Sequence, residues 1–103
     1  MGKVTELKET EFTSAVSSGV VLVDFWAPWC GPCRSFLVIL DQLAEALPEV
    51  KVCKVNVDDC PALAAQFEVQ TVPTLVAFKD GQAVRRWVGL HPKAVLLDAL
   101  QNV

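Results

Sequence analysis

The segment from Val20 to Trp26 limits the possible folds more than any other part of the sequence. Every residue in it is apolar except Asp24. A β-strand that is apolar on both faces lies inside a sheet that is covered on two sides. A helical pattern of apolar residues follows, from about Cys33 to Leu47, and Pro48 marks its end. A buried strand followed by an amphipathic helix predicts an α/β fold.

The rest of the chain extends this alternation of strands and helices. The other expected strands lie over 4–7, 50–57, 74–78 and 83–88, and the other expected helices over 10–18, over 61–67 and from Pro92 onward. Thr10 is expected to cap the first of these helices and Gly19 to end it. Asp80-Gly81 between the last two strands is typical of a hairpin turn. The order βαβαβαββα predicts one domain over residues 1–103, with a central five-stranded mixed sheet flanked by four helices.

Composition and charge exclude several classes of function. The net charge is −3, and the longest basic run is Arg85-Arg86, so we expect no nucleic-acid partner. Charged residues interrupt every apolar run before it could span a membrane, so we expect no membrane association. The first residues lack the apolar stretch of a signal peptide. These features favour a cytoplasmic protein.

Cys30 and Cys33 form a C-x-x-C motif at the junction of the buried strand and the long helix. A cysteine just before a helix meets unsatisfied backbone N–H groups and the positive end of the helix dipole. Both favour the thiolate, which is the nucleophile in disulfide exchange. In such a pair, one thiolate attacks a target disulfide and the second thiol resolves the mixed disulfide.

The alternative interpretation of this motif is half of a zinc site. A structural zinc site needs two further ligands at regular spacing. The remaining candidates are Cys53, Cys60 and His91, and their spacing matches no such site. The pattern therefore favours redox chemistry and predicts no metal, while zinc binding stays the alternative at this point.

Asp24 is the second informative residue, because it interrupts a strand that is otherwise apolar on both faces. A buried carboxyl has a raised pKa and could accept the proton of a buried thiol. Lys54 interrupts the strand over 50–57 in the same way and could be its partner. The alternative is that Asp24 points to solvent.

Pro73, before the strand over 74–78, is compatible with a turn or a cis bond.

The motif and its surroundings resemble the active-site signature of the thioredoxin family. The resemblance extends over the whole chain and has five parts in order: 25–33 (Phe-Trp-Ala-Pro-Trp-Cys-Gly-Pro-Cys), preceded by Val23-Asp24; 54–58; 72–75; 78–81; and Val88-Gly89. It implies the thioredoxin fold. It also implies that Cys30 is the exposed attacking thiol and Cys33 the buried resolving one. Asp24 is similar to the family's buried aspartate, linked to deprotonation of the resolving thiol, and Lys54 to the lysine near it.

The resemblance also implies a docking surface for client proteins. Pro73 is similar to the family's cis-proline beside the dithiol, so we expect a cis Val72–Pro73 bond. The Val72 backbone would pair with an extended client segment. The expected docking residues are Trp29, Gly31, Pro32, Val72 and Gly89, with Leu90 at their edge.

The dipeptide between the cysteines, Gly31-Pro32, resembles that of the reducing members of the superfamily. A proline there removes a backbone donor that could stabilise the thiolate. The resemblance therefore implies a protein-disulfide reductase that needs no cofactor of its own. It would be a monomer, and an NADPH-dependent flavoprotein, thioredoxin reductase, would recycle it. A binding subunit that uses the docking surface without turnover is a second hypothesis.

Some side chains depart from the family pattern or are additional to it. Val38 replaces a proline that usually kinks the long helix, and His91 replaces a hydroxyl residue that caps the last one. Cys53 is expected to be a buried apolar residue. Cys60 is expected to be more exposed, with a lowered pKa, and is a candidate for regulatory oxidation. Of the tryptophans, Trp26 is expected in the core, Trp29 on the surface, and Trp87 exposed or half-buried.

Overall fold

The computed structural model describes residues 4–103. Its strands are β1 (Val4–Glu6), β2 (Val20–Trp26), β3 (Val50–Asn56), β4 (Thr74–Lys79) and β5 (Gln82–Val88). Its α-helices are α1 (Phe12–Ala15), α2 (Gly31–Ala46), α3 (Pro61–Gln66) and α4 (Lys93–Gln101), and a short 3₁₀ helix, η1 (Glu9–Glu11), precedes α1.

The five strands form one mixed sheet in the order β1-β3-β2-β4-β5. β3 pairs in parallel with both β1 and β2, whereas β4 runs antiparallel to β2 and β5. The expected α/β class and five-stranded mixed sheet are therefore confirmed. β2 lies in the middle of the sheet, as its apolar faces indicated, and five of its seven residues are buried.

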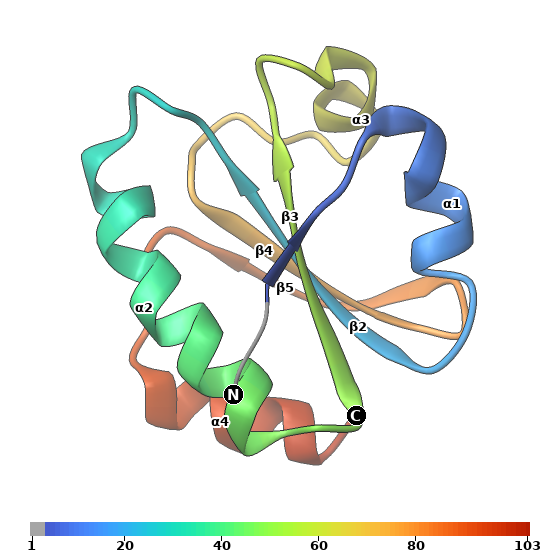
Figure 1. The fold of residues 1–103 in the computed structure, drawn as a ribbon, viewed down its shortest axis with the longest axis vertical. Coiled ribbons are helices and arrows are strands. Elements are labelled where there is room, and N and C mark those ends of the chain that lie inside the picture. The colour runs from blue at the N-terminus through green and yellow to red at the C-terminus, as the bar shows by residue number, and fades with distance from the viewer. Residues whose placement is uncertain (1–3) are drawn as a thin grey trace.

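Helices cover both faces of this sheet (Figure 1). On one face, α2 and α4 pack through Phe36, Leu40 and Leu96. On the other face, α1 and α3 pack through Phe12 and Leu63. The central side chains of β2 thus face packed apolar layers on both sides of the sheet, which makes a charged residue in this strand unusual.

The first helix differs from the expected one. Glu9–Glu11 form a 3₁₀ turn and only Phe12–Ala15 are α-helical. Thr10 lies inside the 3₁₀ turn, so the expected cap at Thr10 was wrong. The Glu11 carboxylate instead accepts a hydrogen bond from the Lys8 backbone N–H at 2.8 Å, which satisfies a free donor at the start of this segment.

The hairpin between β4 and β5 has the expected turn. Asp80 and Gly81 both have left-handed backbones, with φ of 51° and 89°, as a two-residue hairpin turn requires. The Asp80 carboxylate also accepts from the Gly19 N–H at 2.8 Å. The hairpin tip is therefore fixed to the loop that leads into β2.

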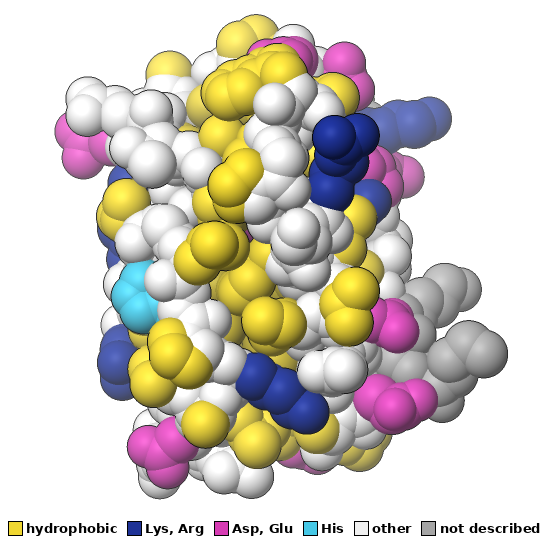
Figure 2. Space-filling model, turned by 90° about the vertical axis from the view of Figure 1, so that its left-hand side faces the viewer, with side chains coloured by type: hydrophobic (Ala, Val, Ile, Leu, Met, Phe, Trp, Pro, Cys, Tyr) yellow, Lys and Arg dark blue, Asp and Glu magenta, His cyan; other side chains and the backbone are white. Residues whose placement is uncertain are grey.

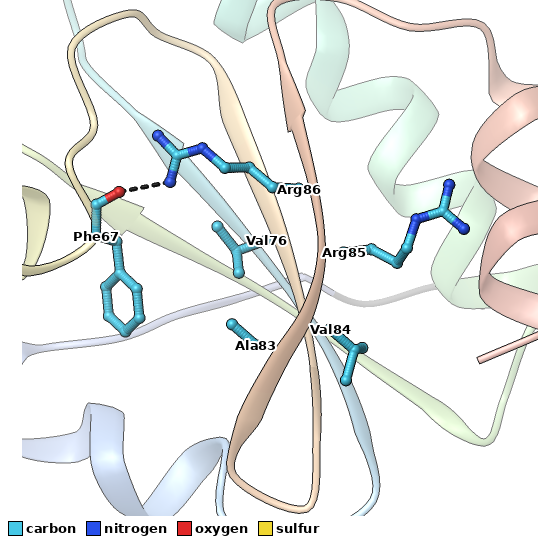
Figure 3. Close-up of a pocket in the computed structure, with 6 residues that line it drawn as sticks. All are labelled: Phe67, Val76, Ala83, Val84, Arg85 and Arg86. Carbon is cyan, nitrogen blue, oxygen red and sulfur yellow. Dashed lines mark hydrogen bonds between the residues drawn. The ribbon is translucent and has the colours of Figure 1, made fainter.

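β5 is an edge strand, and the side chains of Arg85 and Arg86 extend to opposite sides of it (Figure 3). Arg86 donates to the backbone carbonyls of Phe67 and Glu68, just beyond α3. Arg85 lies over the ring of Trp87, 5.3 Å from its centroid. A shallow pocket of about 250 Å³ is lined by Phe67, Val76, Ala83, Val84, Arg85 and Arg86.

Two of the three tryptophans differ from expectation. Trp87 is buried with 6% of its surface exposed, because its side chain turns toward the core under α2 and α4. Trp26 is half-buried rather than part of the core. Within residues 4–103, no helix is long and apolar enough to cross a membrane.

Candidate active site

Cys30 and Cys33 lie where β2 ends and α2 begins, and they form a disulfide with their Cα atoms 5.3 Å apart. Cys33 is wholly buried, as expected, but the expectation of an exposed Cys30 was wrong: only 5% of its surface is exposed, because it packs with Ala27, Cys33 and Val72. Cys30 is the N-cap residue of α2, and its Sγ accepts a hydrogen bond from the Cys33 N–H at 3.1 Å. Pro32 occupies the first turn, where a helix tolerates a missing N–H. The helix start therefore presents a donor and a positive dipole end to the Cys30 sulfur.

The cis-proline loop lies beside this sulfur. The Val72–Pro73 bond is cis, as expected, and the Val72 carbonyl oxygen lies 3.8 Å from Cys30 Sγ. The Pro73 carbonyl accepts from the Gly89 N–H at 2.8 Å. Gly89 has a φ of 83°, which favours glycine at this position. Three segments that are distant in sequence thus meet around Cys30.

The surface around the dithiol is apolar. Trp29 is 69% exposed, as expected for a surface residue, and its Nε1 donates to Asp58 Oδ2 at 3.1 Å. Figure 2 views the molecule from the α2 side and shows hydrophobic side chains in a band over this face, beside the single histidine. A pocket of about 120 Å³ on this face is lined by Pro32, Ser35, Phe36, Ile39, Leu90 and His91.

Asp24 points into the protein and not to solvent, because none of its surface is exposed. Its strand neighbours are Lys54 on β3 and Leu75 on β4. Burial raises its pKa from 3.8 to about 7, although the nearby Lys54 ammonium favours the ionised form and Glu6 opposes it. Among the described residues, neither carboxyl oxygen has a hydrogen-bond partner.

Lys54 lies next to Asp24 in the sheet, but its ammonium group contacts other groups. Its Nζ is 3.7 Å from Glu6 Oε1 and 4.8 Å from the centroid of the Trp26 ring. Trp26 Nε1 donates to the other oxygen of Glu6 at 3.3 Å. Sequence reasoning missed Glu6, because only the pairing of β1 with β3 brings it beside Lys54.

The two additional cysteines are both free and buried. Cys53 is wholly buried, as expected. The expectation for Cys60 was wrong, because only 2% of its surface is exposed. Burial and the nearby acidic groups, Glu9 first among them, raise the pKa of Cys60 rather than lower it. Cys60 closes the loop after β3 with its N–H bonded to the Asn56 carbonyl, which turns its side chain into the core under α1 and α3.

The start of α4 differs from the cap expected at His91. Pro92 is the N-cap residue of α4, and no side chain caps this helix. His91 Nδ1 instead lies 3.2 Å from the Gly89 carbonyl oxygen. Among residues 4–103, no three His, Cys, Asp or Glu side chains lie close enough together to hold a metal ion.

A family model described as Thioredoxin matches residues 3–102. The chain belongs to the thioredoxin family. Thioredoxins from several strains of Staphylococcus aureus are 44% identical to it over 100 residues, covering 96% of each chain. It is thus a thiol–disulfide oxidoreductase whose redox-active pair is Cys30 and Cys33, and the family acts in general on client disulfides.

Solved structures agree with this thioredoxin assignment. A mutant thioredoxin from Halobacterium salinarum NRC-1 has a TM-score of 0.90 at 37% identity, with coverage of 97% of this chain and 89% of that one. A second solved chain has a TM-score of 0.89 at 32% identity and covers 98% of this chain and 96% of its own length. It comes from a structure that describes the thiol resolving mechanism of a yeast mitochondrial 1-Cys peroxiredoxin via the glutathione and thioredoxin systems.

Proposed function

We propose that the chain, as a single domain over residues 1–103, reduces disulfides of client proteins, with Cys30 as the attacking thiol. The observation that carries this proposal is the placement of Cys30 at the start of α2, where its sulfur accepts the Cys33 N–H. The same interactions stabilise a thiolate in the reduced form. Gly31-Pro32 favours reduction over oxidation of clients, as the family resemblance implies.

The reaction proceeds in two exchanges. The Cys30 thiolate attacks one sulfur of the client disulfide, forms a mixed disulfide and releases one client thiolate. Cys33 then loses its proton, attacks Cys30 Sγ and releases the second client sulfur. The client disulfide gains two electrons and leaves as two thiolates, which take up protons from water, and the chain ends as the Cys30–Cys33 disulfide, the form described above.

Asp24 takes the proton of Cys33 in this proposal. Both groups are wholly buried, so bulk water is a poor acceptor for this thiol. A carboxyl with a pKa of about 7 is well matched to proton transfer near neutral pH. Lys54 contributes a positive charge that favours the ionised form of Asp24.

The docking surface consists of Trp29, Gly31, Pro32, Val72 and Gly89 around the cis-Pro73. Trp29 is largely exposed, and a side chain built at Gly31 would meet open space, so the client backbone can approach the dithiol. An extended client segment pairs with the backbone of Val72. The Gly89–Pro73 hydrogen bond holds two parts of this surface together.

The partners that follow from this chemistry are disulfide-containing proteins and a reductase. The chain needs no cofactor of its own, and a thioredoxin reductase that uses flavin and NADPH returns the disulfide to the dithiol. We propose that the chain acts as a monomer in the cytoplasm. Oxidation of NADPH by such a reductase, measured with and without this chain, tests the recycling step, and no added turnover would contradict it.

Insulin reduction by dithiothreitol tests the main proposal. We expect the native chain to accelerate insulin precipitation and Cys30→Ser to leave the background rate. Cys60→Ala is the matched control, because it removes a buried thiol outside the site, and it should retain the native rate. Failure of the native chain to accelerate precipitation, or full activity of Cys30→Ser, would overturn the proposal.

A further inference from the structure

Lys54 lies between two carboxyl groups in one row across the sheet. The strand register pairs Glu6 with Lys54 and Lys54 with Asp24. Side chains that are directly opposite in neighbouring strands point to the same face of the sheet. Glu6 and Asp24 therefore flank Lys54 on opposite sides, on the same face of the sheet.

The contacts of Lys54 favour Glu6. Its ammonium group lies 3.7 Å from Glu6 Oε1, and it makes no ion pair with Asp24 among the described residues. Trp26 adds to this preference, because its ring lies under the ammonium while its Nε1 donates to Glu6. The carboxyl oxygens of Asp24 have no hydrogen-bond partner within residues 4–103.

We propose that Glu6 competes with Asp24 for the ammonium group of Lys54 and so weakens the support that Lys54 gives to the ionised form of the buried carboxyl. Glu6 is a positioning residue, because it acts on the buried acid through Lys54 and does not touch the dithiol. The consequence for turnover rests on the proposed role of Asp24 as the proton acceptor.

The surroundings of Asp24 leave few other groups that could set its charge. β4 contributes the apolar Leu75 beside it. The helices on this face, α2 and α4, contribute the apolar layer of the core, and Cys33 at the start of α2 is held in the disulfide. The two described charged groups that act on Asp24 are Lys54, which lowers its pKa, and Glu6, which raises it.

The two side chains of the ion pair are partly exposed, with 20% of the Lys54 side chain and 45% of the Glu6 side chain accessible to solvent. Water and salt therefore weaken this interaction. We expect Glu6→Gln to shift the titration of Asp24 downward by about 0.5 pH unit, which is about threefold in proton affinity. High salt should reduce the difference.

The direct test is a ¹³C NMR titration of the Asp24 carboxyl carbon in the oxidised protein. Glu6→Gln should move the midpoint to lower pH, and Lys54→Met should move it to higher pH. In the Lys54→Met background, Glu6→Gln should have a clearly smaller effect, because the group for which the two carboxyls compete is gone. Glu49→Gln, at the exposed turn before β3, is the matched control for loss of one negative charge and should leave the midpoint in place.

Three results would overturn the inference: an unchanged or raised midpoint in Glu6→Gln, an undiminished effect in the Lys54→Met background, or an equal shift in Glu49→Gln. The pH profile of insulin reduction then links the shift to turnover, and its rising limb should move to lower pH in Glu6→Gln. If the Asp24 midpoint does not move in Glu6→Gln while the native chain reduces insulin normally, the inference about Glu6 is refuted and the proposed function stands. A native chain that reduces no insulin refutes the proposed function, whatever the NMR titration gives.

Discussion

Replacement of Asp24 by asparagine should stabilise the folded protein, and more so as the pH rises. Burial raises the pKa of this carboxyl from 3.8 to about 7, so the folded state holds a proton that the unfolded chain releases at lower pH. Each tenfold change in proton affinity corresponds to about 1.4 kcal/mol, so the ionised group costs the folded state about 4 kcal/mol above pH 7.

The sign follows from proton linkage. Between pH 3.8 and about 7, folded Asp24 binds a proton and unfolded Asp24 does not, so the free energy of unfolding falls as the pH rises. Below this range both states are protonated and the contribution vanishes. Asparagine cannot ionise, and its amide is equally buried at every pH. The difference between Asp24→Asn and the native chain should therefore grow from pH 4 to pH 8.

Urea unfolding of the oxidised protein at pH 4, 6 and 8 measures this difference. From pH 4 to pH 8, the free energy of unfolding of Asp24→Asn should rise by up to about 4 kcal/mol relative to that of the native chain. Insulin reduction by Asp24→Asn should be slower than that by the native chain. A stability difference that is the same at all three pH values would refute the reasoning. It would mean that Asp24 ionises in the folded state as readily as in the unfolded chain.

Three further predictions concern parts of the structure away from Asp24. Leu40→Ala, in the wholly buried face of α2, should cost about 2–5 kcal/mol in urea unfolding, and a loss below 1 kcal/mol would contradict the packing described. Arg86→Met removes two solvent-exposed hydrogen bonds to carbonyls beyond α3 and should cost about 0.5–1.5 kcal/mol. Arg85→Met removes no hydrogen bond that the structure describes and should cost less, and equal losses would argue against this role of Arg86. Cys60 should resist iodoacetamide in the native protein, because burial raises the pKa of its thiol, whereas Cys30, once reduced, should be alkylated, because its sulfur accepts a hydrogen bond at the start of α2. Mass spectrometry after mild peroxide that finds oxidised Cys60 would contradict this prediction.

Much of the fold could be predicted from local sequence patterns. The run of β2, apolar on both faces except at Asp24, predicted a central strand, because a strand with two apolar faces must be covered on both sides. Asp80-Gly81 predicted the hairpin, because two successive left-handed residues are needed there. Cys30 at the strand–helix junction predicted the site, because the chemistry depends on a position that is visible in one segment.

Features that depend on tertiary packing were not predictable in this way. Cys60 follows two aspartates and precedes a proline, which is a pattern of exposed turns, yet the loop turns its side chain into the core. The hairpin register buries Trp87 although the rest of β5 is exposed. Glu6 is an ordinary acidic residue in the sequence, and only the pairing of β1 with β3 brings it beside Lys54.

The central claim is that Cys30 and Cys33 form a reducing dithiol that works on client disulfides. Its most direct test is the reduction potential of this pair, measured by equilibration with glutathione and separation of the two redox forms. We expect a value close to the one that is general for thioredoxin, about −270 mV. A value near those of isomerases or stronger oxidants, about −180 mV or above, would contradict it, because the chain would then form or rearrange disulfides rather than reduce them.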